Sequence, residues 1–306
     1  MKNLIDILSQ YNSIAIAGMA KNAGKTTTLN YMISGFAVQG AVLGLTSIGL
    51  DGEETDQVTS TPKPRIFAPA GTVVATAEKL LVKRERGIND IAKQILAVID
   101  IATPLGRVVV ARALTDGNVM LAGPSMVSQI APIMQILQDH GATKIIIDGA
   151  AGRKSLAVPH VAQAIVLATG AGLSKSMDTV IAETRHIAEI FNLPTPQMTS
   201  QTVVGAALCR PSPEYTHIPG AVTDTKIDGL YDKQILAEDA TKILITPKTL
   251  ARIRLSGGSI SVQNRINLAA ITINPTSPYG TNFDAALFLE KMSEMINVPI
   301  FNVERG

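Results

Sequence analysis

The sequence contains a single cysteine, no tryptophan and only 4% aromatic residues. Cys209 has no partner for an internal disulfide, which favours a reducing compartment. Residues 1–12 carry acidic and polar side chains where a signal peptide has a basic and then an apolar segment, so we expect a cytoplasmic protein. So few aromatic side chains provide little material for stacking the bases of a single-stranded nucleic acid.

An excess of charge of one sign is also lacking. With 27 Lys and Arg residues against 25 Asp and Glu residues, the net charge of +2 creates no long-range field that would attract nucleic acid or an anionic membrane. The most apolar runs, residues 35–50 and 161–173, are shorter than the ~20 residues that span a bilayer, so we expect no membrane partner. The four histidines lack metal-ligand spacing and a cysteine pair, which argues against a zinc site.

The segments that are present alternate between short apolar strands and longer helices. Continuous apolar runs of strand length are typical of parallel strands that helices cover on both faces. We therefore predict the α/β fold class, with a mainly parallel sheet flanked by helices. Strands are expected at residues 13–17, 41–48, 144–147, 164–168, 269–274 and 299–303, and helices at 26–38, 124–140, 176–191 and 283–296.

Two intermediate stretches have a different character. Residues 55–69 are polar and proline-rich, which predicts a surface loop able to cover a ligand. Between residues 88 and 121 we expect a helix and then short strands, 107–113 and 119–121, with a turn at Asp116-Gly117-Asn118.

The last third of the chain predicts an addition to the main fold. Residues 194–266 are rich in Thr, Val and Pro, and we expect them to form a β-rich insertion or subdomain, with strands at 202–210 and 259–266. The whole chain, residues 1–306, would then be a single α/β domain that carries this insertion.

A phosphate-binding motif lies between the first predicted strand and helix. Residues 18–26, GMAKNAGKT, match G-x-x-x-x-G-K-[ST] at every fixed position. In such a P-loop, successive backbone N–H groups and the helix N-terminus surround a phosphate, Lys25 reaches its outer oxygens, and Thr26 binds magnesium. We expect Gly18 and Gly24 to take unusual dihedral angles close to the phosphate. The other expected nucleotide contacts are Lys21, Asn22, Ala23 and Thr27.

This motif and its flanks predict the P-loop NTPase fold. The alternative is a strand-to-helix turn that uses its glycines for geometry alone. For Lys21, stabilisation of phosphate charge and plain solvation are both open.

Magnesium on a triphosphate needs oxygen ligands, and two strand ends offer carboxylates. Asp148 follows a hydrophobic strand in the manner of a Walker B element, and Asp51 ends the second strand. Both are candidate metal ligands with Thr26, and candidate catalytic residues with Lys25. The alternatives are an Asp148 that caps the next turn and an Asp51 that forms an Asp-Gly turn.

Three further segments bear on the nucleotide. Residues 149–154, with Arg153, resemble a switch that senses the outermost phosphate, although an exposed basic turn is equally open. Residues 169–172 predict a tight turn between a strand and a helix. Asn274, after a late strand, is a candidate base contact. Because no Asn-Lys-x-Asp guanine signature occurs, we expect ATP with Mg²⁺.

Residues 21–27 resemble the loop of the P-loop branch that contains dethiobiotin synthetase and the guanine-dinucleotide accessory protein of molybdenum cofactor synthesis. Residues 47–53, 148–155 and 274–284 resemble the small reactivase subunit associated with lysine 5,6-aminomutase. That resemblance implies a protein partner: a cobalamin- and pyridoxal-phosphate-dependent aminomutase, maintained together with a MutS-related ATPase subunit.

Three functions remain open from the sequence. The first is an ATP-binding, slowly hydrolysing accessory protein that acts on a partner enzyme. The second is a ligase or kinase similar to dethiobiotin synthetase, which transfers the γ-phosphoryl group to a small carboxylate. The third is a binding module in which the nucleotide only stabilises the fold. Phosphate release with protein partners or with small acceptors separates them.

Overall fold

The computed structural model describes residues 3–49, 65–82, 90–149, 161–196, 215–277 and 279–303. Several predictions lie outside these residues: Asp51, most of the 55–69 loop, Arg153 with most of the switch segment, and strand 202–210.

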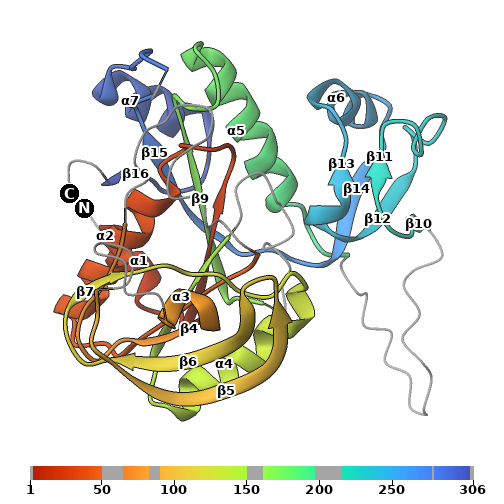
Figure 1. Cartoon of the computed structure of the whole chain (residues 1–306). Coiled ribbons are helices and arrows are strands. Elements are labelled where there is room, and N and C mark those ends of the chain that lie inside the picture. The colour runs from red at the N-terminus through yellow and green to blue at the C-terminus, as the bar shows by residue number, and fades with distance from the viewer. Residues whose placement is uncertain are drawn as a thin grey trace, which may run out of the picture. The chain divides into compact units, whose positions relative to one another are not determined.

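The chain divides into two compact units, of which the first comprises Met1–Arg185 and Leu268–Gly306 and the second His186–Asn267 (Figure 1). The region predicted as an insertion or subdomain, residues 194–266, falls within the second unit. Each unit has its own sheets.

The first unit contains a nine-stranded sheet in the order β16-β15-β9-β1-β8-β2-β4-β6-β5. Neighbouring strands from β16 to β4 are parallel, and β6 runs antiparallel to β4 and to β5. The mainly parallel sheet predicted from the apolar runs is therefore confirmed. The strands are β1 (Ser13–Gly18), β2 (Leu43–Ser47), β4 (Val73–Ala77), β5 (Lys93–Thr103), β6 (Gly106–Ala113), β8 (Lys144–Asp148), β9 (Ala164–Gly170), β15 (Leu268–Asn274) and β16 (Ile300–Asn302).

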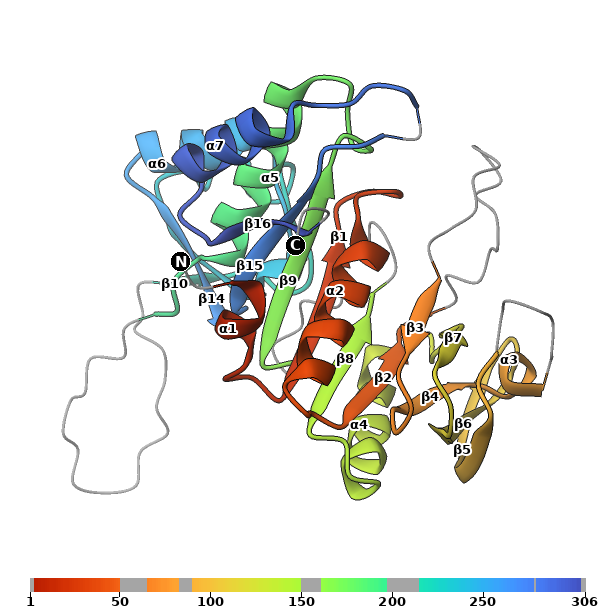
Figure 2. The ribbon, with the colours of Figure 1, turned by 90° about the vertical axis from the view of Figure 1, so that its left-hand side faces the viewer.

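Helices cover both faces of this sheet. On one face lie α1 (Leu4–Leu8) and α2 (Lys25–Val38), and Figure 2 shows both in front of the sheet. On the other face lie α4 (Ile130–Asp139) and the first part of α5 (Met177–Phe191), whose residues from His186 onward are assigned to the second unit (Figure 2). Short α3 (Glu78–Val82) contacts β6, and α7 (Ala285–Met295) contacts β16.

The core between α2 and the sheet follows from helical periodicity. Leu29, Met32, Ile33 and Phe36 recur at the spacing that places them on one side of a helix, and all are fully buried. They pack with α1 and with alternate residues of the central strands, such as Ile14, Ile16, Leu45, Ile146 and Val166. This packing fixes the start of α2 at the carboxyl ends of the parallel strands.

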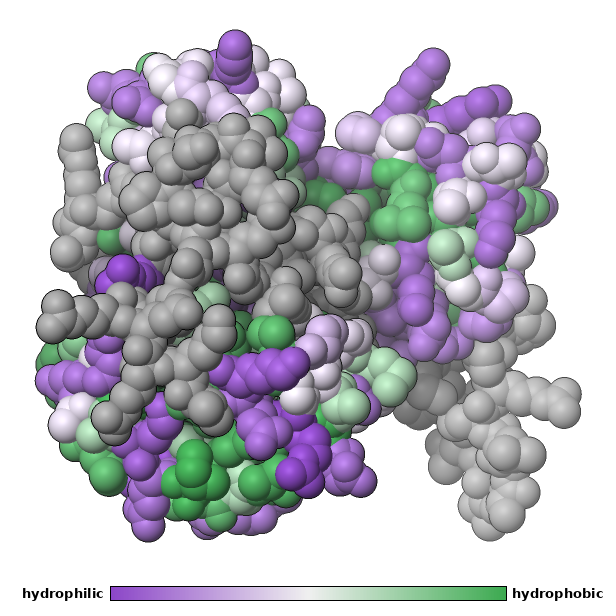
Figure 3. Space-filling view, viewed as in Figure 1, coloured by the Kyte–Doolittle hydropathy of each residue, from purple (hydrophilic) through white to green (hydrophobic). Residues whose placement is uncertain are grey.

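The segment expected to be helical after residue 88 is instead the edge strand β5, which forms a hairpin with β6. The run from Ile95 to Ile101 is rich in β-branched residues, which favour strands. The outer strand leaves Ile95 and Val98 about half exposed, at 51% and 50%. Figure 3 shows apolar side chains gathered over the lower part of the first unit, where β5 and β6 lie in Figure 1.

A small antiparallel pair accompanies this hairpin. Strand β3 (Ile66–Ala68) pairs with β7 (Gly117–Val119). Two expectations are thereby corrected: the end of the predicted 55–69 loop is a strand, and the predicted turn at residues 116–118 already belongs in part to β7. Backbone pairing between segments distant in the chain outweighed the local turn preference of Asp-Gly-Asn.

The second unit is built around a parallel sheet of β10 (Tyr215–His217), β12 (Gln234–Asp239) and β14 (Ser259–Asn264). A second parallel pair joins β11 (Val222–Thr223) and β13 (Ile243–Leu244). Helix α6 (Pro247–Leu255) begins after Thr246, whose hydroxyl accepts a hydrogen bond from the Thr249 N–H at 3.3 Å. The strand predicted at residues 259–266 is β14.

Among the described residues, no helix combines the length and the apolar character needed to cross a membrane.

Candidate functional site

The loop between β1 and α2 is held by both neighbours of β1. The Met19 N–H donates to the carbonyl of Ala168 in β9 at 3.0 Å, and the Gly149 N–H, just after β8, donates to the carbonyl of Ile16 at 3.1 Å. The first bond attaches the beginning of the loop to β9, and the second joins the end of β8 to β1 just before the loop, at the edge where these parallel strands end together.

The backbone turns sharply at two residues of the loop. Asn22 has φ 60° and Gly24, which caps the start of α2, has φ 88°. Both lie in the left-handed region, which glycine adopts at least cost and asparagine tolerates better than most residues. The unusual dihedral expected of Gly24 is thus present, whereas that of Gly18 is not, because Gly18 ends a regular strand.

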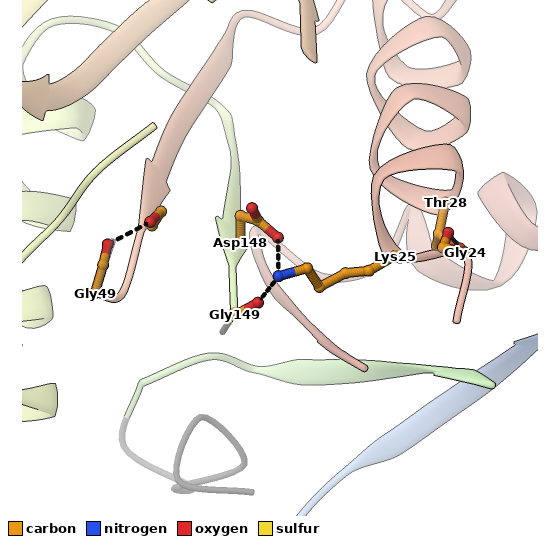
Figure 4. A network of polar contacts seen from close by, with 7 residues as sticks. Gly24, Lys25, Thr28, Gly49, Asp148 and Gly149 are labelled. Carbon is orange, nitrogen blue, oxygen red and sulfur yellow. Dashed lines mark hydrogen bonds and ion pairs between the residues drawn. The ribbon is translucent and has the colours of Figure 1, made fainter. Parts of the chain in front are cut away.

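The Lys25 side chain reaches from the first turn of α2 to the end of β8 (Figure 4). Its ammonium lies 3.3 Å from Asp148 Oδ1 and donates a hydrogen bond to the carbonyl of Gly149. Both side chains of this ion pair are only 9% exposed. A charge held out of water needs such a partner, since desolvation would otherwise cost several kcal/mol.

The position of Asp148 follows from strand register. Asp148 lies opposite Ile16 of β1 and opposite Ser47 of β2, so it ends the strand between them. The apolar residues 145–147 are buried in β8, and Asp148, the first polar residue after them, meets Lys25 at the start of α2. The register shows that β8 lies next to β1, as expected of a strand that carries a Walker B element.

Two glycines, Gly170 at the end of β9 and Gly172 just after it, leave no room for a side chain against their neighbours. A Cβ on Gly172 would lie 2.9 Å from the Asn22 carbonyl oxygen, and a Cβ on Gly170 would lie 2.1 Å from the Asn274 carbonyl oxygen. The Ala171 N–H between them donates to that same Asn274 carbonyl at 2.9 Å. The turn predicted at residues 169–172 begins only at Ala171, because residues 169 and 170 still belong to β9, and Gly172 packs against Asn22 of the loop.

Asn274 lies next to the loop between β1 and α2. A Cβ on Gly24 would lie 2.8 Å from the Asn274 Cβ, and the side-chain amide nitrogen of Asn274 is also near, at 3.5 Å. The Asn274 Oδ1 accepts hydrogen bonds from the backbone N–H and the hydroxyl of Thr276, at 2.8 and 2.7 Å. These bonds orient the amide group at the carboxyl end of β15.

The remaining predicted contacts differ in exposure. Thr26 and Thr27, in the first turn of α2, and Asn22 are partly buried, Ala23 is buried, and Lys21 is exposed. Within the described ranges, no three His, Cys, Asp or Glu side chains form a group that could bind a metal without other ligands. A metal at this edge would need oxygen atoms of other kinds, and the Thr26 hydroxyl is one.

Two residues of the site were not predicted. The hydroxyls of Thr28 in α2 and Thr272 in β15 lie 2.7 Å apart, and Thr28 also donates to the Gly24 carbonyl at 3.1 Å. A signal exists in the sequence, because Thr272 is the only polar residue between Leu268 and Ile273. A polar residue in a buried strand needs a hydrogen-bond partner.

Comparisons with protein-family models, with curated proteins and with solved structures found no match to this chain. The site itself offers a lysine ammonium, a buried carboxylate and the start of a 14-residue helix at one strand edge. This combination is suited to a polyphosphate and a divalent cation, because it supplies positive groups for the anion and oxygen ligands for the cation.

Proposed function

We propose that this protein binds ATP with Mg²⁺ on residues 18–27 and hydrolyses it slowly, as an accessory protein that acts on a partner enzyme. The observation that carries the proposal is the Lys25–Asp148 pair at 3.3 Å, which joins the motif lysine to the acidic residue of the neighbouring strand. Two sequence signals 123 positions apart, the lysine of a complete motif and an aspartate that follows an apolar strand, meet at one point of the fold.

The residues present fit a magnesium polyphosphate. Lys25 and the first backbone N–H groups of α2 would hold phosphate oxygens, since the helix N-terminus carries partial positive charge. Thr26 and Asp148 would supply oxygen ligands to the cation. Magnesium, when bound, neutralises charge on the phosphates, and Lys25 would exchange its contact with the Gly149 carbonyl for a phosphate oxygen.

The base is proposed to be adenine. Asn274 is oriented at the carboxyl end of β15 by its two bonds to Thr276. Those bonds use the amide oxygen, so the NH₂ group of Asn274 is the part suited to donate to a ring nitrogen. The absence of an Asn-Lys-x-Asp signature in the sequence supports adenine over guanine.

The partner is proposed from resemblance. Residues 47–53, 148–155 and 274–284 resemble the small reactivase subunit, so the partner enzyme would be a cobalamin-dependent aminomutase acting with a MutS-related ATPase. Hydrolysis completed by contacts from a partner is consistent with slow basal turnover, because positioning and charge stabilisation contribute several orders of magnitude in P-loop enzymes.

The binding test compares Lys25→Ala, Asp148→Asn and the parent protein by calorimetric titration with ATP and Mg²⁺. Lys25→Ala should weaken binding at least about tenfold, the effect of losing a charged hydrogen bond. Asp148→Asn should reduce the dependence of binding on Mg²⁺. Lys291→Ala is the matched control, because it removes the lysine of an exposed pair with Asp178 and should leave affinity unchanged.

Stability must be followed in the same variants. Removing Lys25 leaves the buried Asp148 carboxylate without this cation, which costs about 3–5 kcal/mol in comparable pairs. Asp148→Asn instead leaves the Lys25 ammonium without its carboxylate, although Lys25 keeps its hydrogen bond to the Gly149 carbonyl. Unfolding is therefore measured for both variants, and either folded variant tests binding. ATP binding that is unchanged in both variants, with both folded, would remove the proposal.

Phosphate release then separates the functions. Stimulation by an aminomutase supports the accessory role, stimulation by small carboxylates supports a ligase similar to dethiobiotin synthetase, and binding without any release supports a module in which the nucleotide stabilises the fold.

A further inference from the structure

A chain of buried hydroxyls connects β15 to the phosphate loop. Thr28 is fully buried and Thr272 is 1% exposed, and their hydroxyl oxygens lie 2.7 Å apart. The Thr28 hydroxyl also lies 3.1 Å from the carbonyl of Gly24, the residue that caps α2. Burying a polar group costs folding free energy unless the group is hydrogen-bonded.

The direction of each hydrogen bond in this chain is determined. A carbonyl oxygen only accepts, so the single hydroxyl proton of Thr28 goes to Gly24. The bond between the two hydroxyls must then use the proton of Thr272. Thr272 donates to Thr28, and Thr28 donates to the Gly24 carbonyl, which also accepts the first helical bond from the Thr28 N–H at 2.9 Å.

The same face of β15 also approaches Gly24 directly. Thr272 and Asn274 are two residues apart in a strand, so their side chains point to the same side. Asn274 lies where a Cβ on Gly24 would be 2.8 Å away. Strand β15, which is separated from β1 by β9, therefore fixes the residue at the start of α2 through two side chains.

We propose that Thr272 is a positioning residue for the phosphate loop, which touches no phosphate and acts through Thr28 on the Gly24 peptide. The orientation of that peptide sets the direction of the N–H groups that follow it at the start of α2. This inference rests on the proposed function, since the N–H groups matter only if they bind a phosphate.

The test replaces Thr272 by valine, which has nearly the same shape and no hydroxyl. Thr272→Val should weaken the binding of ATP, and of inorganic triphosphate with Mg²⁺, by about three- to tenfold, the range that one hydrogen bond contributes. Thr272→Ser retains the donor and should restore affinity to within about twofold of the parent protein. Inorganic triphosphate is used because it lacks a base, so a loss shared by both ligands belongs to the phosphate loop.

Thr46→Val is the matched control. Thr46 is fully buried in β2 of the same sheet, and its hydroxyl has no hydrogen-bond partner among the described residues. The same replacement there should leave affinity unchanged. Thermal unfolding of all variants is measured in parallel, because a purely structural role of Thr272 would lower the melting temperature without changing affinity below it.

The outcomes separate the two proposals. If the parent protein binds neither ATP nor triphosphate, the proposed function fails and this inference fails with it. If the parent binds both and folded Thr272→Val binds them equally well, only the inference is overturned. A loss that serine does not restore also overturns it, because the effect would then not depend on the hydroxyl.

Discussion

Gly18 and Gly24 are the two fixed glycines of the motif. Only Gly24 has a backbone conformation that favours glycine. At Gly24, φ is 88° and an added Cβ would lie 2.8 Å from the Asn274 Cβ. Gly24→Ala should therefore destabilise the fold by about 2 kcal/mol or more, from left-handed strain and crowding together. At Gly18 an added Cβ meets nothing nearer than 3.5 Å, and Gly18→Ala should change stability by less than about 0.5 kcal/mol.

Chemical unfolding followed by circular dichroism measures both variants without any ligand. Equal losses of stability in the two would contradict the difference in backbone geometry.

The sequence identified Lys25 and Asp148 as candidates for one site, and the structure pairs them. For Thr272 it shows only an isolated polar residue in an apolar strand, without its partner. The lysine belongs to a local motif, and the aspartate directly follows an apolar run, so both are visible within a few residues. Thr272 acts on a residue 248 positions away, across a sheet in which β9 separates β15 from β1. That strand order arises from tertiary packing and leaves no local pattern in the chain.

Among the elements, strand β5 shows how a β-bulge can imitate a helix. Ile95 pairs with Ala111 and Val98 pairs with Val109, so an extra residue is accommodated between them. Because residues 109 and 111 share a face of β6, Ile95 and Val98 share a face although they are three positions apart. Three-residue spacing is a helical signal, whereas strands without bulges alternate. Strands without bulges, such as β1 and β8, were predicted correctly to within one residue.

Helix α6 allows a prediction about pH. Asp224 Oδ1 accepts a hydrogen bond from the Thr246 N–H, at the cap of this helix, at 3.0 Å. That bond is the main cause that lowers the pKa of Asp224 below its usual 3.8. The ionised form is favoured in the folded state, so its contribution is complete above pH 3.8 and is lost as the pH falls through the lower, folded pKa.

The contribution should be less than about 1 kcal/mol, since the carboxylate is partly exposed and screened by solvent. Carbon-detected NMR titration of the Asp224 carboxyl measures the pKa directly. Asp224→Asn keeps an acceptor for Thr246 and should abolish only the pH-dependent part of the stability. A carboxyl that titrates at or above 3.8 would contradict the assignment of this bond.

At the scale of the whole molecule, the loop between β1 and α2 and the contacts described for it above belong to the first unit. Residues 18–28, Asp148, Thr272 and Asn274 all lie within Met1–Arg185 and Leu268–Gly306. The second unit has its own sheets and buried side chains, such as Ile235, Leu250 and Val262. A ligand that binds only one folded unit stabilises that unit alone by mass action.

We therefore expect ATP with Mg²⁺, at about 100 times its dissociation constant, to stabilise the first unit by about 2.7 kcal/mol and the second by much less. Hydrogen exchange measured by mass spectrometry gives the two values separately, from peptides of β1 and β8 in the first unit and of β12 and β14 in the second. Lys291→Ala should leave the protection unchanged, while Asp148→Asn should reduce it. Equal protection of both units by the nucleotide would mean that they unfold together as one cooperative body. It would contradict the expectation that the two units differ in stability when the nucleotide is bound.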